Sequence, residues 1–136
     1  MEKPNITGVH HISLKAEGAE AFERVLDFYC NILGLELHER WENASGLPCA
    51  MIRLGGGVLL EVMSSGTMPK GENGSVDHFA LATDTVDLAV EAVREAGYEI
   101  TMEPRDGRLG VAAPRDIRIA FCRGPLGESI EFFHVK

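Results

Sequence analysis

The sequence has few of the features that mark exported, membrane or nucleic-acid-binding proteins. It has only three cysteines, Cys30, Cys49 and Cys122, and their spacing is not that of a metal or disulfide framework, so we expect free thiols. No uncharged stretch approaches the roughly 20 apolar residues of a membrane span, and the N-terminus lacks the features of a signal peptide. Basic residues number 13 against 21 acidic ones, and the net charge of −8 disfavours nucleic acid and anionic membranes as partners. We therefore expect a cytoplasmic protein.

An internal repeat is the most informative feature present. Both halves read as strand, helix, strand, strand, strand. The first half places these elements at about 9–14, 19–33, 35–41, 50–54 and 58–63. The second half places them at about 76–81, 85–96, from 98 onward, 117–123 and 129–135. We predict an α+β fold in a single domain, 1–136, made of two β-α-β-β-β repeats at about 6–63 and 76–135.

Helix periodicity and loop composition add detail to this prediction. The first helix carries apolar residues at three- and four-residue steps from Phe22 to Leu33, which predicts one face packed on the core. Residues 64–75, rich in Gly, Ser, Pro and Lys, read as a linker between the halves. Residues 103–115, with two prolines and two glycines, read as a long loop and a candidate active-site flap.

Four polar residues interrupt apolar strands at matching places in the two halves. His11 and His78 lie in the first strand of each half, and Glu61 and Glu131 lie in the last. Their apolar neighbours point to the face where the helices pack, so all four share the other, concave face. Taken singly, each histidine or glutamate is more often an ordinary structural residue. Four at equivalent places favour one divalent ion, and the absence of a thiolate suits Ni, Co, Zn, Mn or Fe(II). We predict a curved mixed sheet around this metal cavity.

The paired repeats resemble the vicinal oxygen chelate superfamily, whose members include glyoxalase I, methylmalonyl-CoA epimerase, extradiol dioxygenases and the bleomycin and fosfomycin resistance proteins. The motifs that carry the likeness are HHISL at 10–14, FYCNILGL at 28–35 and GPLGESIE at 124–131. The resemblance covers roughly residues 6–135 and implies a glyoxalase-like fold. It also implies that the metal ligands are His11 (not His10), Glu61, His78 and Glu131, the set seen in glyoxalase I.

The function that this resemblance implies is that of a metal-dependent lyase or isomerase of the glyoxalase class, either a lactoylglutathione lyase-type lyase or an epimerase. Its small substrate would chelate the metal through two adjacent oxygens, and loss of the α-proton would give an enediolate. Glu131 is implied as the base, and Glu61 as the second acid or base. Two alternatives stay open: a small-molecule (antibiotic) binding or resistance protein, and an Fe(II)-dependent ring-cleaving dioxygenase.

Three basic residues are candidate substrate contacts. Lys15 stands four residues after His11, where glyoxalase I tends to carry an arginine. Arg105 and Arg108 lie in the expected loop, where guanidinium groups would meet an anionic substrate tail. Because resembling families commonly pair half-sites from two chains, we also expect a homodimer.

Overall fold

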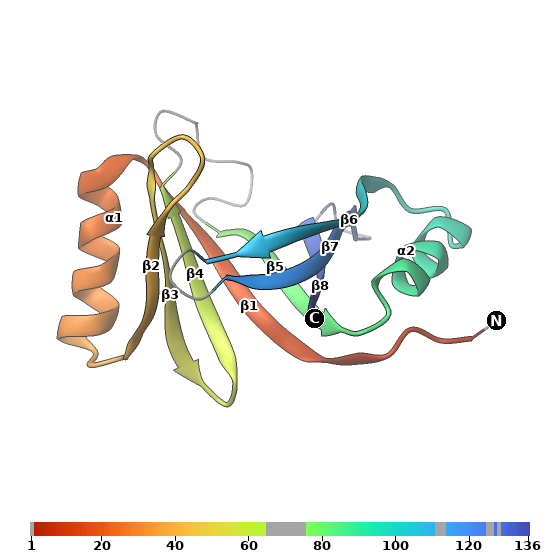
Figure 1. The fold of residues 1–136 in the computed structure, drawn as a ribbon, viewed down its shortest axis with the longest axis horizontal. Helices are drawn as coiled ribbons and strands as arrows, with labels where there is room; N and C mark the ends of the chain where they lie inside the picture. Colours follow the sequence, from red (N-terminus) through yellow and green to blue (C-terminus); the bar gives the residue numbers. More distant parts are fainter. Residues whose placement is uncertain (1, 65–75, 111–113, 125–126, 128) are drawn as a thin grey trace. The chain divides into compact units, whose positions relative to one another are not determined.

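The structure is a computed structural model that describes residues 2–64, 76–110, 114–124, 127 and 129–136 (Figure 1). The described residues form eight strands, two α-helices and one π-helical turn, in the order that the two repeats predict. The chain divides into two compact units, His11–Asp77 and Met1–His10 with His78–Lys136. This architecture confirms the predicted α+β fold of two β-α-β-β-β repeats. Of the linker predicted at 64–75, Ser64 is the last residue of a strand, and residues 65–75 lie outside the described residues.

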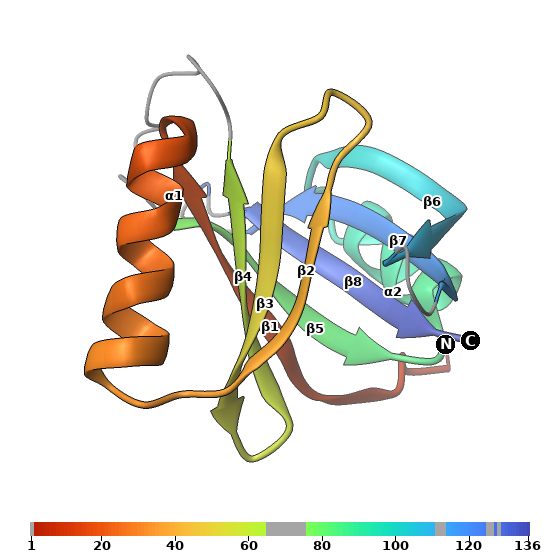
Figure 2. The same cartoon turned by 60° about the vertical axis from the view of Figure 1, so that its left-hand side comes forward.

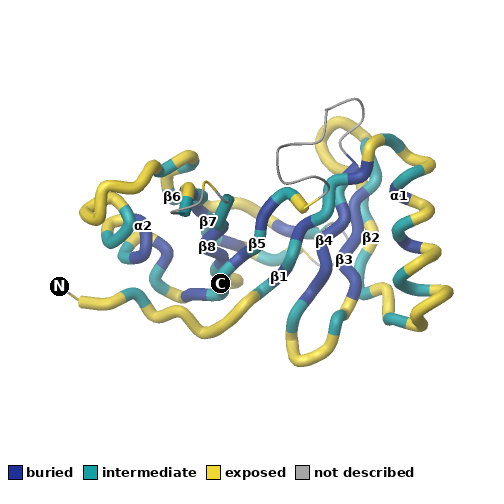
Figure 3. Tube along the Cα trace, turned by 180° about the vertical axis from the view of Figure 1, so that it is seen from behind, coloured by how far each residue is buried: buried dark blue, intermediate teal, exposed yellow. Residues whose placement is uncertain are grey.

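The unit His11–Asp77 packs one helix on a four-stranded mixed sheet. Its elements are β1 (Ile6–Ala16, shared with the other unit), α1 (Gly18–Leu26), the π-helical turn η1 (Asp27–Ile32), β2 (Leu37–Glu42), β3 (Pro48–Gly55) and β4 (Val58–Ser64). The strand order is β2-β3-β4-β1, with β1 and β4 parallel and the other pairs antiparallel. Phe22 and Leu26 of α1 pack on Ile52, Leu60 and Val62. Figure 2 shows α1 along one face of this sheet, and Figure 3 shows how β3 and β4 are buried.

The first helix departs from the regular helix that the sequence predicts. After Leu26 the chain continues as η1, where the N–H of Leu33 donates to the carbonyl of Phe28 at 3.0 Å, a step of five residues instead of four. A wider turn rotates the following side chains relative to the core. Ile32 and Leu33 are 66% and 55% exposed, so the prediction that the apolar face continues to Leu33 is wrong beyond Tyr29.

The second unit repeats the arrangement. Its remaining elements are β5 (Val76–Thr83, whose first two residues belong to the other unit), α2 (Val86–Glu95), β6 (Ile100–Leu109), β7 (Arg115–Arg123) and β8 (Ser129–Val135). The strand order is β5-β8-β7-β6, with β5 and β8 parallel and the other pairs antiparallel. Val86, Ala89 and Val90 of α2 pack on Ala120 and Phe132. Within the described ranges, no helix has the length and apolar character needed to cross a membrane.

The long loop predicted at 103–115 is largely a strand. β6 runs to Leu109 and pairs with β7, so the flap prediction is wrong for residues 103–109, while residues 111–113 lie outside the described part of the chain. Pro104 is tolerated because β6 is the last strand of the sheet order and its register with β7 shifts between Met102 and Arg105. An edge strand with a bulge does not need the N–H that proline lacks.

An ion-pair network joins α2 to the outer strands of its unit. Arg118 on β7 holds Asp87 of α2 through two 2.7 Å hydrogen bonds, from Nε and from Nη2. Its Nη1 donates to Asp106 of β6 at 3.1 Å, and the same oxygen lies 2.7 Å from Lys136 Nζ. The hydrogen bonds from Arg118 lower the pKa of Asp87, and those from Lys136 and Arg118 lower the pKa of Asp106.

We expect this ion-pair network to make the free energy of unfolding fall more steeply at acid pH than it would without the network. An aspartate whose pKa is lower in the folded state stabilises the fold above its unfolded pKa of about 3.9, and this contribution is lost as the pH falls through the folded value. Arg118→Gln should therefore flatten the fall in the free energy of unfolding below about pH 4–5, measured by urea unfolding from pH 6 to pH 3. Arg24→Gln is the control, because its exposed pair with Glu20 lies on α1. An unchanged slope in Arg118→Gln would contradict the role of the network.

Candidate metal centre

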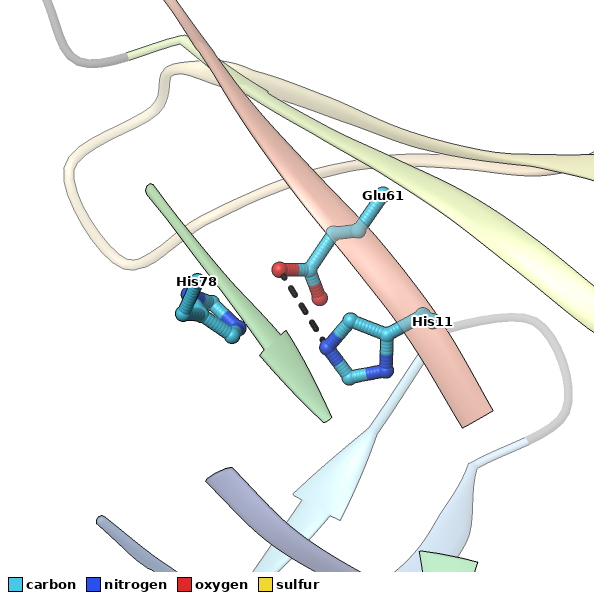
Figure 4. A group of neighbouring side chains, drawn as sticks. All are labelled: His11, Glu61 and His78. Atoms are coloured by element: carbon cyan, nitrogen blue, oxygen red, sulfur yellow. Dashed lines mark ion pairs between the residues drawn. The ribbon is translucent and has the colours of Figure 1, made fainter. Parts of the chain in front are cut away.

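The parallel pair β1 and β4 places an imidazole beside a carboxylate. Leu60 and Val62 face the α1 core, so Glu61 between them points to the opposite face of the sheet. His11 is fully buried and Glu61 is 8% exposed. His11 Nε2 lies 3.8 Å from Glu61 Oε1, the ion pair drawn as a dashed line in Figure 4. The alternation predicted from the sequence thus brings this histidine and this glutamate together.

The parallel pair β5 and β8 builds the same arrangement in the other unit. Glu131 lies between Ile130 and Phe132, which pack in the α2 core. His78 and Glu131 are both buried, and His78 Nε2 lies 3.0 Å from Glu131 Oε2. The ring of Phe121 on β7 meets the His78 ring edge-on, with 5.1 Å between centroids. Each unit therefore carries one buried imidazole–carboxylate pair.

The donor atoms of these pairs fit a divalent metal ion. His11 and Glu61 of one unit offer an imidazole nitrogen and a carboxylate oxygen, and His78 and Glu131 of the other unit offer the same two kinds of ligand atom. Nitrogen and carboxylate oxygen without sulfur suit a borderline or hard metal, because thiolates select the softer ones.

A buried thiol, that of Cys49, lies near Glu61. Cys49 on β3 is buried and unbonded to any other cysteine. Burial raises the pKa of the Cys49 thiol, and the negative charge of Glu61 raises it further. The Cys49 thiol would therefore have to lose its proton in order to bind a metal ion, because the thiolate is the form that does so. Cys30 and Cys122 are also free, as the sequence predicts.

The three basic residues expected to contact substrate lie in different surroundings. Lys15 Nζ is 2.9 Å from Asp77 Oδ1, and both side chains are partly buried. Arg108 Nε is 3.2 Å from Asp116 Oδ1 on the exposed surface, and Arg105 is exposed on β6. The sequence patterns did not predict a role for Asp77. Its position directly before His78 is the feature that would have pointed to it. Substrate contact by the three basic residues stays a prediction.

A comparison with protein families decides the family. The sequence matches the Glyoxalase/Bleomycin resistance protein/Dioxygenase superfamily over residues 8–132. The chain belongs to this superfamily. Membership confirms the resemblance to the vicinal oxygen chelate proteins and includes the four predicted metal ligands in the matched region. A search of curated proteins found no match.

Several solved structures share the fold of this chain. A hypothetical protein from Bacillus halodurans C-125 has a TM-score of 0.72 and 20% identity, with 94% of each chain covered. Methylmalonyl-CoA epimerase from Mycobacterium tuberculosis has a TM-score of 0.72 and 18% identity, covering 100% of this chain and 93% of that one. A Streptomyces coelicolor methylmalonyl-CoA epimerase in complex with 2-nitronate-propionyl-CoA has a TM-score of 0.72 and 23% identity, with 96% of each chain covered. At these identities the likeness shows the fold alone.

Proposed function

We propose that this superfamily member is a metal-dependent isomerase or lyase that removes the α-proton of a small substrate bound through two adjacent oxygens. The observation that carries the proposal is the pair of buried His–Glu sets, one at the equivalent place in each repeat. Burying a carboxylate is costly unless it is paired, so a fold that buries two of them beside imidazoles needs a reason to keep them. Holding one metal ion supplies that reason.

Four side chains would hold the ion: His11, Glu61, His78 and Glu131. When bound, the ion supplies a Lewis acid that polarises the substrate carbonyl and stabilises the negative charge left when the proton departs. The rest of the chemistry belongs to the protein. It must position a base within hydrogen-bonding reach of the α-carbon and keep water away from it.

Glu131 is the residue that we assign as the base. Its carboxylate is only 4% exposed and lies beside His78 Nε2. Phe121 lies opposite Glu131 in the β7–β8 pair, and its ring also flanks His78, so an aromatic surface shields the pair from water. A carboxylate oxygen of Glu131 accepts the α-proton and returns it to the same carbon, or to its neighbour, to complete an epimerisation or an isomerisation.

The substrate class follows from this chemistry and from the relatives. Epimerases among the structural relatives are described with CoA thioesters, and an acyl thioester with a carboxylate at C2 has an acidic α-proton and two oxygens that could chelate a metal ion. Glyoxalase I, in contrast to the epimerases, carries a glutamate at the place of Glu61. Its type of substrate, a hemithioacetal, also offers an acidic α-proton and two neighbouring oxygens. We therefore propose a substrate that joins a carbonyl or thioester to an adjacent oxygen. The homodimer and the cytoplasmic location expected from the sequence stay predictions.

The direct test of the site is its metal content. We expect about one divalent ion per chain, removed by a strong chelator and regained on adding metal, as measured by elemental analysis of the purified protein. His11→Ala and His78→Ala should each lose most of the bound ion, since each substitution removes one of the four proposed metal ligands. His38→Ala is the matched control, because His38 lies on β2 with its Nδ1 2.9 Å from Arg53. Full occupancy in both ligand variants would contradict the proposed site.

A further inference from the structure

The two repeats differ at one buried position beside their glutamates. Ser13 on β1 lies opposite Glu61 on β4, and Ala80 on β5 lies opposite Glu131 on β8. Each residue comes two positions after the histidine of its repeat, and each is fully buried. Ser13 and Ala80 are therefore equivalent positions in the two halves, and they differ only by a hydroxyl group.

The contacts of the two glutamate side chains also differ. Ser13 Oγ donates a hydrogen bond to Glu61 Oε1 at 2.9 Å, and the same oxygen lies 3.8 Å from His11 Nε2. In the other unit the nearest histidine nitrogen lies 3.0 Å from a Glu131 oxygen, and the methyl group of Ala80 has no hydrogen bond to give. The Glu61 carboxylate therefore contacts the Ser13 hydroxyl, whereas the Glu131 carboxylate contacts His78.

The hydrogen bond from Ser13 holds Glu61 in a defined orientation. A hydroxyl that donates to an ionised carboxylate makes a charge-assisted bond, which is stronger than one between neutral groups. Because Ser13 is fully buried, its hydroxyl has no water to turn to, and breaking the bond would leave a buried polar group unsatisfied. Hydrogen bonds of this kind orient metal ligands and commonly change metal affinity by about 10- to 100-fold.

We propose that Ser13 is a positioning residue that gives the two glutamates different tasks. The Ser13 hydroxyl keeps Glu61 in place as a fixed metal ligand. The side chain opposite Glu131 is the methyl group of Ala80, so Glu131 is not oriented by a hydroxyl at this position, and it is the carboxylate that takes up and returns the proton. The inference rests on the proposed metal-dependent proton transfer, and it assigns an unequal division of labour to two residues that the repeat makes equivalent.

The experiment compares Ser13→Ala with the reciprocal variant Ala80→Ser. Metal affinity is measured by competition with a coloured chelator, and the ligand geometry is followed by the visible spectrum of the Co²⁺-loaded protein. Ser13→Ala should weaken metal binding by about 10- to 100-fold and shift the Co²⁺ spectrum, because Glu61 loses its orientation. Ser13→Thr keeps the hydroxyl and should restore most of the affinity. Ala80→Ser should retain the metal and instead slow α-proton exchange of a 2-methyl acyl thioester that also carries a carboxylate at C2, in D₂O, by about 10-fold or more.

Each outcome bears on the proposal. The proposal is overturned if Ser13→Ala keeps wild-type metal affinity and an unchanged Co²⁺ spectrum while the wild type binds metal, and the proposed function would survive that result. It is also overturned if Ser13→Ala and Ala80→Ser impair the same quantity to the same extent. A wild type that binds no divalent ion would overturn both the proposed function and this inference. Loss of affinity in Ser13→Ala with recovery in Ser13→Thr supports it.

Discussion

Replacing Glu131 with glutamine is expected to slow exchange of the substrate α-proton with solvent deuterium by about 10²- to 10⁴-fold, the usual loss when a general base is removed. Glutamine keeps nearly the same shape and an oxygen that can face a metal, but it cannot accept the proton. Exchange is followed by NMR in D₂O with methylglyoxal hemithioacetal, a 2-methyl acyl thioester that also carries a carboxylate at C2, and a plain hydroxyketone. Variant and wild type are compared at matched metal content.

Glu61→Gln is the matched control for this experiment. It makes the same chemical change at the equivalent place in the other repeat, and the epimerases that the sequence resembles usually carry glutamine there. We therefore expect a smaller loss of exchange in Glu61→Gln than in Glu131→Gln. Equal exchange in Glu131→Gln and wild type would remove Glu131 from the role of base. Absence of exchange with all three compounds by the metal-loaded wild type would favour the binding-protein or dioxygenase alternatives.

The largest expected effect on stability comes from the first helix. Phe22→Ala should lower the free energy of unfolding by about 3–5 kcal/mol, because removing a buried aromatic ring loses its burial and leaves a cavity. Phe22 is fully buried among residues of α1, β3 and β4, and the guanidinium carbon of Arg40 lies 5.1 Å from its ring centroid. The free energy is measured by urea unfolding at neutral pH.

Phe28→Ala makes the same truncation six residues further along and is the control. Phe28 lies in η1, is 47% exposed and meets Tyr29 edge-on with 5.1 Å between ring centroids. Its loss should cost about 1 kcal/mol or less, since nearly half of the residue is already exposed to solvent. A cost as large for Phe28→Ala as for Phe22→Ala would show that the core assignment of α1 is wrong.

The features that follow from local periodicity were predictable from the sequence. Alternation in the strands predicted that Leu60 and Val62 face the helix and that Glu61 faces away from it, and the structure agrees. The pairing of His78 with Glu131 follows from the same rule applied to the second repeat. Period-two patterns are reliable where one face of a strand packs on a core.

The features that depend on distant partners were not predictable. Pro104 and Gly107 read as a loop because nothing near them in the sequence shows that they lie on an edge strand paired with β7. The π-helical turn has no distinct residue signature, so Ile32 was expected on the buried face. Ser13 reads as an ordinary strand residue until the register of β1 against β4 places it opposite Glu61. The β6 and Ser13 cases share one cause, which is that the sequence of one segment does not show which distant strand it pairs with, whereas the π-helical turn is a local departure from regular helix.

The division of β1 between the two units has a consequence for how the protein is made. Residues 1–10 belong with residues 78–136, and they are joined to them by the hydrogen bonds from the Asn5 N–H to Thr85 Oγ1 at 2.8 Å and from the Thr7 hydroxyl to the Ala82 carbonyl at 3.1 Å. Residues 1–10 are synthesised before residues 78–136, so they leave the ribosome before these partners exist. Contacts of such long sequence separation slow folding and leave a strand edge exposed in the meantime. During this interval, whose length is set by the rate of translation, residues 1–10 lack the partners with which they pair in the folded protein.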